Sequence, residues 1–246
     1  MLEANTNNRH ISRDKVAEYA NEIRAGRWQL NGSTIVMNGS RLLDGQHRLL
    51  AVIEADQPIK TLVVKGVDDS VFATIDTGKM RTKADVLSIS GERNCSALAS
   101  SLAIVERYYA GRLNGERLIR FTNAEILILL EKYPDMRESV DSAWKKKKAM
   151  LLTQSIKCAM HYLFSKVNKT EADRFFVDLS KGQNLQEGDP VLALRHRLIL
   201  NSVGRAKLPA HIIIALVIKA FNARLHNKAV SSLGYYSKEK FPTIGA

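Results

Sequence analysis

Residues 41–53 read RLLDGQHRLLAVI, a short apolar segment that breaks at Asp-Gly and continues with apolar residues at helical spacing. The sequence therefore predicts a strand that runs directly into a helix. A glycine at such a junction allows a tight turn and a close approach of the backbone to a ligand. The first N–H groups of the helix and its dipole favour an anion. The candidate phosphate-binding residues are Gly45, Gln46, His47 and Arg48.

The same residues also fit a simple turn between a strand and a helix. Asp44 would then only cap the helix, and His47 would be a hydrogen-bonded structural histidine. Arg48 would be hydrated or paired with a surface carboxylate. Turn chemistry alone leaves both interpretations open.

The first ninety residues predict alternating helices and strands, which is typical of a compact α/β unit. Ser12 is a suitable N-cap and Gly26 a suitable helix stop. Asn38-Gly39 favours a tight hairpin turn. The expected elements are a helix between Ser12 and Gly26, a hairpin of residues 34–37 and 41–43, a helix to Ala55, a buried strand at 61–67, and helices at 70–73 and 81–89.

After Gly91 the strand patterns end and helical spacing continues. Thr122 with Glu125 predicts a capping box, and Asp189-Pro190 predicts an N-cap with a first-turn proline. The expected helices lie at about 94–110, 122–134, 135–147, 153–166, 171–180, 190–203 and 209–226, with residues 233–236 forming a strand or an ordered tail. The expected fold is α+β, with an α/β domain at 1–92 and an all-α helical domain at 93–246.

Composition limits the environment of the protein. The chain of 246 residues is 45% hydrophobic, which is sufficient for a sizeable core. It contains no apolar run long enough to span a membrane and no secretory signal. The two cysteines do not form a metal-binding or disulfide pattern. We therefore expect a cytoplasmic protein with no membrane partner.

The net charge of +12 is unevenly distributed. Residues 1–91 carry 12 Lys/Arg and 11 Asp/Glu, whereas residues 92–246 carry 25 and 14. Such an excess favours polyanions through counterion release, although a solvated basic surface is the alternative. A lysine run beside a tryptophan suits phosphate contacts with stacking. The candidate nucleic-acid residues are Trp144, Lys145, Lys146, Lys147, Lys148, Arg195 and Arg197.

The DGQHR segment and its flanks resemble the ParB/sulfiredoxin superfamily, whose GxHR-type loops at a helix start contact nucleotide phosphates. The wider frame resembles phage and bacterial proteins commonly called ParB-like. It consists of residues 8–12, 26–28 and 74–82, and the resemblance covers residues 3 to 93, with looser similarity at 188–194 and 220–224. Gln46 stands where sulfiredoxin has its reductive cysteine, which excludes sulfinic acid repair.

This resemblance implies a nucleoside triphosphate, CTP or ATP, bound together with Mg²⁺. Carboxylates and substrate phosphates are the ligands that Mg²⁺ prefers, so Asp44 and Asp76 are the candidate metal-binding and catalytic residues. The remaining candidates for the nucleotide pocket are Thr77, Gly78, Arg81, Asn8 and Arg9.

The function expected is that of a ParB-like protein that binds a nucleotide and engages DNA through its basic helical domain. Nucleotide binding or hydrolysis would act as the switch. One alternative is an ATP- or ADP-dependent phosphotransferase acting on a hydroxyl of a small molecule or a modified DNA base. Another is a DNA-binding protein that needs no nucleotide. The sequence leaves open the base, hydrolysis of the nucleotide and the oligomeric state, a homodimer included.

Overall fold

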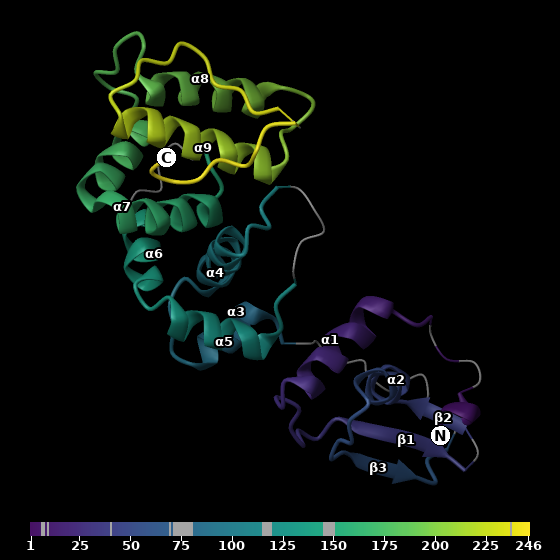
Figure 1. The fold of residues 1–246 in the computed structure, drawn as a ribbon. Coiled ribbons are helices and arrows are strands. Elements are labelled where there is room, and N and C mark those ends of the chain that lie inside the picture. The colour runs from purple at the N-terminus through teal and green to yellow at the C-terminus, as the bar shows by residue number, and fades with distance from the viewer. Residues whose placement is uncertain are drawn as a thin grey trace. The chain divides into compact units, whose positions relative to one another are not determined.

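The computed structural model describes residues 1–5, 8, 10–39, 41–68, 70, 81–114, 120–144, 151–236 and 238–246. The chain divides into two compact units, Met1–Met80 and Arg81–Ala246. The described elements are mostly helices, with one three-stranded sheet, so the fold is mixed α+β (Figure 1). Within the described ranges, no helix has both the length and the apolar character required to cross a membrane.

The N-terminal unit carries the sheet, whose strand order is β2-β1-β3. β1 pairs antiparallel with β2 and parallel with β3, which places Ile35 beside Val63. The predicted hairpin and its two flanking helices are confirmed. The elements are a 3-10 turn η1 (Leu2–Ala4), α1 (Arg13–Arg24), β1 (Thr34–Asn38), β2 (Arg41–Asp44), α2 (Gln46–Ala55) and β3 (Leu62–Lys65).

Helix α2 connects the two small cores of this unit. Ala51 and Ala55 pack with the buried face of α1, which includes Val16 and Ala20. Leu49 packs instead on the strand residues Ile35, Met37 and Leu42. The start of α2 is therefore held against the end of β2, where the candidate site lies.

The expectation that residues 61–67 form a buried strand is half right. β3 is present, but Leu62, Val63 and Val64 are all exposed. β3 occupies an edge of the sheet, because only β1 pairs with it among the described strands. β-branched residues favour an extended backbone, but they do not determine whether another layer covers the strand. The short helix expected at 70–73 falls largely outside the described residues.

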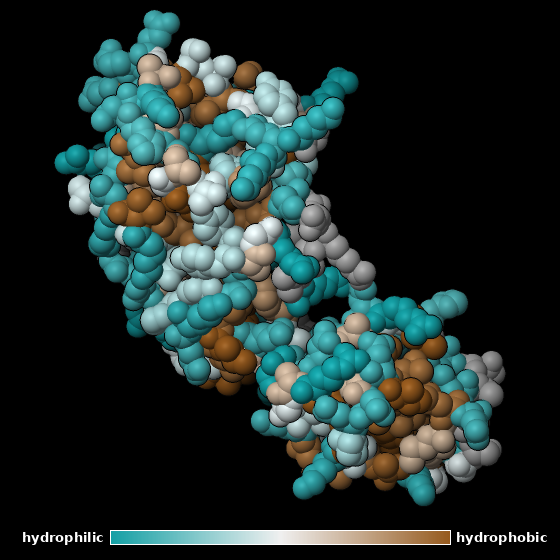
Figure 2. Space-filling view, in the orientation of Figure 1, coloured by the Kyte–Doolittle hydropathy of each residue, from teal (hydrophilic) through white to brown (hydrophobic). Residues whose placement is uncertain are grey.

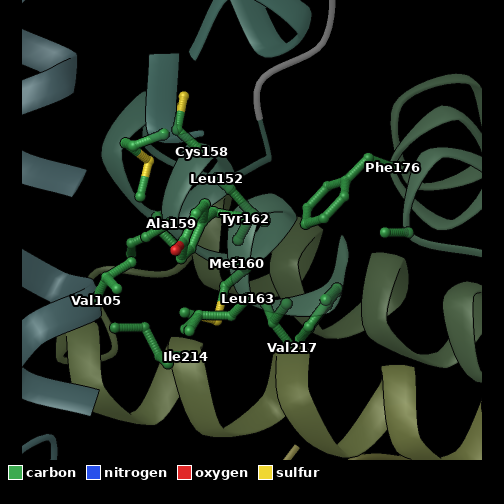
Figure 3. Packing of buried hydrophobic residues seen from close by; sticks show 14 of the residues in the cluster. Val105, Leu152, Cys158, Ala159, Met160, Tyr162, Leu163, Phe176, Ile214 and Val217 are labelled. Atoms are coloured by element: carbon green, nitrogen blue, oxygen red, sulfur yellow. The ribbon is translucent and has the colours of Figure 1, made fainter. Parts of the chain in front are cut away.

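The second unit contains helices only among its described elements. Its core includes the run 214–218 of the last helix and side chains of α7 such as Met160 and Leu163 (Figure 3). The helices are α3 (Lys83–Ile89), α4 (Cys95–Tyr109), α5 (Asn123–Lys132), α6 (Met136–Trp144), α7 (Gln154–Lys181), α8 (Pro190–Val203) and α9 (Ala210–Leu225).

The helix starts expected from the sequence are largely confirmed by their caps. Glu125 N donates to Thr122 Oγ1 at 3.2 Å, and Thr122 N donates to Glu125 Oε2 at 2.8 Å, which completes the capping box. Asp189 Oδ1 accepts a hydrogen bond from Val191 N at 2.7 Å. These bonds satisfy N–H groups that the helices leave unpaired at their starts.

Two helices expected at 153–166 and 171–180 form one element, α7, that is broken at Asn168. This residue has an extended backbone (φ −154°, ψ 103°), and its Oδ1 accepts from Glu171 N at 3.0 Å. The second arm of α7 is therefore capped by Asn168. A polar side chain that hydrogen-bonds to the backbone nearby can replace a helical bond, which explains the break.

The boundary between the units falls between Met80 and Arg81, twelve residues before the expected position. The reason is packing, because α3 lies against α4 and α5 and its Leu87 is fully buried in the helical core. Residues 233–236 form an ordered tail. Leu233 and Tyr235 pack on the same core, and Lys219 Nζ donates to the carbonyl of Gly234 at 2.7 Å.

Candidate functional site

The junction between β2 and α2 is built around Gly45. This residue is the N-cap of α2 with φ +106°, and no side chain caps the helix there. A Cβ atom at this position would lie 3.2 Å from Ile35 Cγ1 and 3.3 Å from Ile35 Cα. Glycine is thus required both by the backbone conformation and by the close approach to β1. The strand-to-helix turn predicted from the sequence is confirmed.

Asp44 organises this junction from the last position of β2. Its Oδ1 accepts a hydrogen bond from Gly45 N at 2.7 Å. Its Oδ2 accepts from Arg48 Nη2 at 2.6 Å, and the same nitrogen donates to the carbonyl of Thr34 at 2.6 Å. The carboxylate therefore orients the guanidinium of Arg48 at the first turn of α2.

The guanidinium of Arg48 is not fully hydrogen-bonded. Its Nε is buried and has no hydrogen-bond partner among the described residues. A buried donor without an acceptor costs about 1–3 kcal/mol, more when it is charged.

The other side chains of the segment connect it to the N-terminal residues. His47 Nε2 accepts a hydrogen bond from Ser12 N at 3.0 Å, so this nitrogen carries no proton. Gln46 Oε1 accepts from Asn5 Nδ2 at 3.2 Å. Asn8 Nδ2 donates to the carbonyl of Leu42 at 2.7 Å. These three predicted site residues hold the chain terminus against the end of the sheet.

Most of the other residues predicted for the nucleotide pocket lie outside the described residues. Arg9, Asp76, Thr77 and Gly78 are outside the described residues. Arg81 is exposed at the start of the helical unit, where its carbonyl accepts from Asn123 Nδ2 at 3.0 Å.

Of the two carboxylates expected to hold Mg²⁺, only Asp44 lies among the described residues. Both oxygens of Asp44 already accept hydrogen bonds from Gly45 and Arg48. Across the described ranges, no three His, Cys, Asp or Glu side chains lie together as a metal site. The geometry therefore gives Asp44 a positioning role toward Arg48.

The predicted nucleic-acid residues separate into different groups. Lys145, Lys146, Lys147 and Lys148 lie outside the described residues, directly after Trp144, which ends α6. The guanidinium of Arg195 donates to the carbonyl of Leu179 and lies against Gly182, the C-cap of α7. Arg197 is exposed, and no described residue pairs with its guanidinium.

The whole excess of positive charge belongs to the helical unit. Residues 1–80 contain ten Lys/Arg and ten Asp/Glu, whereas residues 81–246 contain 27 and 15. The two units thus differ sharply in electrostatic character, and the helical unit is the one suited to polyanions.

The structure also assembles a polar chain that the sequence did not indicate. Ser139 Oγ lies 3.0 Å from His161 Nδ1, and Asp173 Oδ1 lies 3.1 Å from His161 Nε2. Ser139 and His161 are each only 4% exposed, so a substrate cannot reach the hydroxyl. The three residues join α6 to both arms of α7 and serve packing. Their separations along the chain match no motif.

Comparison of the chain with protein-family models, curated proteins and solved structures finds no match. What the protein does is therefore inferred from its residues and their geometry.

Proposed function

We propose that the N-terminal unit binds a nucleotide through its phosphates at the start of α2, and that the helical unit engages DNA. The observation that carries the nucleotide proposal is the uncapped start of α2 at Gly45, beside the oriented guanidinium of Arg48. This assignment agrees with the resemblance of residues 41–53 to the ParB/sulfiredoxin superfamily.

An anion at this point gains from two sources. The N-terminal end of a helix stabilises a negative charge by about 0.3–1 kcal/mol, and by up to ~2 kcal/mol when partly buried. Arg48 adds a charge-assisted donor that Asp44 and Thr34 already hold in place. The entropy of ordering this side chain is thus lost on folding and not on binding.

The negative charge of Asp44 would oppose a phosphate if it were uncompensated. Its 2.6 Å ion pair with Arg48 balances that charge locally. The proposal therefore assigns phosphate contacts to the backbone of α2 and to Arg48. Asp44 acts through Arg48, and no step depends on a metal ion.

Charge supports the proposed engagement of DNA by the helical unit. A basic unit that contacts phosphates releases counterions, so its affinity falls as salt concentration rises. A bound nucleotide that changes DNA affinity would make the N-terminal unit a switch. DNA binding measured with and without nucleotide tests this coupling, since equal affinities would show that the two ligands are independent.

The nucleotide site can be tested by thermal shift with ATP, CTP, GTP and inorganic phosphate, each with and without Mg²⁺. A ligand that binds only the native state raises the melting temperature. We expect a nucleotide to do so for the wild type and to lose the effect in Arg48→Gln. Arg24→Gln is the matched control, because Arg24 Nη2 contacts the carbonyl of Glu54 near the other end of α2.

An equal shift in Arg48→Gln and the wild type would refute the role of Arg48, and the absence of any shift in the wild type would refute the site. If Arg48→Gln does not fold, amide NMR of the wild type replaces it. A nucleotide bound at this site must shift the amide signals of Gln46, His47 and Arg48 more than those of α1.

A further inference from the structure

A long part of the helical unit is devoid of acidic residues. Residues 190–238 contain no Asp or Glu but eight Lys/Arg and three His. This segment includes α8, α9 and the turn that joins them. α9 is largely buried in the core, so the exposed side chains of this segment come from α8, from the turn and from the stretch that follows α9.

One side of α8 is exposed and combines apolar with basic side chains. Val191, Leu194 and Leu198 point into the core. Leu200 is 62% exposed and Val203 is 77% exposed. Arg197 precedes Leu200 by three residues, as Leu200 precedes Val203, so the three share one stripe of the helix. Figure 2 shows apolar side chains interrupting the hydrophilic surface over α8.

The cations of this region differ in what they contact. Lys207 Nζ donates to the carbonyls of Asn201 and Ser202 and so closes the end of α8. Arg195 closes the end of α7 in the same way. Arg197 and Arg205 are exposed, and neither guanidinium is engaged by a described residue. We define Arg197, Leu200, Val203 and Arg205 as the α8 outer face.

We propose that the α8 outer face is the surface through which the helical unit contacts DNA. Arg197 and Arg205 contact phosphates, while Leu200 and Val203 contact sugars and base edges between them. This inference rests on the proposed engagement of DNA and names its contact surface.

Charge selects this occupant. A second copy that presented the same face would bring like charges together, because residues 190–238 contain no acidic group. A polyanion is complementary to the same charges. The apolar side chains add a second kind of contact to the phosphate contacts, since architectural proteins place such side chains against the bases.

The test measures the affinity of the full chain for duplex DNA at a series of salt concentrations. Fluorescence anisotropy is the readout. In Arg197→Ala/Arg205→Ala, the slope of log affinity against log salt should fall by about 0.9 for each lost phosphate contact. In Leu200→Ser/Val203→Ser, affinity should fall several-fold while the slope stays unchanged. All four side chains are exposed, so both variants should keep the melting temperature of the wild type.

The matched control is Lys166→Ala/Lys169→Ala, which removes two exposed cations from α7. These lysines are paired with Asp135 and Glu138, so the slope should change little. If the arginine variant keeps the wild-type slope of log affinity against log salt, the proposal is overturned. DNA engagement would then use another surface, and an acidic protein would be the next partner to test on the α8 outer face. Wild-type affinity in the serine variant would overturn the apolar contact. No salt-dependent binding by the wild type would overturn the DNA function itself.

Discussion

Arg48 and Asp44 lie four residues apart, on either side of Gly45, and a 2.6 Å ion pair joins Arg48 Nη2 to Asp44 Oδ2. The same arginine nitrogen donates to the carbonyl of Thr34, so the pair links the start of α2 to both β1 and β2. Both side chains are largely buried, at 14% and 23% exposure. The pair is therefore part of the fold as well as of the proposed phosphate site.

Removal of the carboxylate should destabilise the N-terminal unit. Asp44→Ala leaves the partly buried guanidinium of Arg48 without its anion and should lower the free energy of unfolding by about 1–3 kcal/mol. Urea unfolding followed by Trp28 fluorescence, in a Trp144→Phe background, measures the change. Glu18→Ala breaks the more exposed Lys15–Glu18 pair and should cost less than about 1 kcal/mol. Equal costs for the two variants would contradict the importance of the Arg48 pair.

Gly45 should tolerate a side chain less well than a neighbouring glycine with positive φ. Gly45→Ala combines a left-handed backbone with a Cβ contact 3.2 Å from Ile35 Cγ1, and should cost about 1–3 kcal/mol of unfolding free energy. Gly39→Ala is the matched variant, since Gly39 has φ +45° but open space around it. Its cost should be the smaller of the two in the same urea experiment. The reverse order would show that contact with β1 is unimportant.

Tyr133 should ionise at a higher pH than an ordinary tyrosine. Burial and a 2.5 Å hydrogen bond to Glu106 Oε2 raise the pKa of Tyr133 to about 12, from an ordinary value of 10.0. The native state thus holds the phenolic proton where the unfolded state releases it, so its contribution to stability is complete below pH 10 and is lost as the pH rises toward 12. Tyrosinate absorbance should contain a component near pH 12 that Tyr133→Phe removes. Tyr236→Phe changes an exposed tyrosine and should leave this component in place. If the component near pH 12 persists in Tyr133→Phe, the assignment to Tyr133 is wrong.

The two thiols should differ in reactivity. Burial raises the pKa of the Cys158 thiol to about 11, whereas Cys95 is only half buried. Because the thiolate is the reactive form, a thiol reagent at about pH 8 should modify Cys95 first and Cys158 only after unfolding. Cys95→Ser should abolish the early reaction in the native protein, while Cys158→Ser should preserve it. A fast reaction that survives Cys95→Ser would mean that Cys158 is accessible.

The helix starts were predictable because their signals are local. A cap such as Thr122 with Glu125 forms between residues three apart, so it can be identified without knowledge of the rest of the fold. The junction at Gly45 was predictable for the same reason. The break of α7 at Asn168 lies in the gap expected between the helices at 153–166 and 171–180.

The partners within the candidate site were not predictable. Gln46 meets Asn5 and His47 meets Ser12 across more than thirty residues, and no spacing rule connects them. The position of the unit boundary also depends on distant packing, because Leu87 is buried by helices that follow it in the chain.

The amino-acid sequence by itself determined the types of most elements, the residues at which most helices begin and the basic character of the second unit. These properties depend on residue type and on neighbours three or four positions away. The tertiary structure alone decided how each charged side chain is used. Arg195 and Arg197 are two residues apart and so point about 200° apart on α8. Packing of α8 on its neighbours placed Arg195 against the end of α7 and left Arg197 in solvent, because only packing determines which side of a helix faces the core.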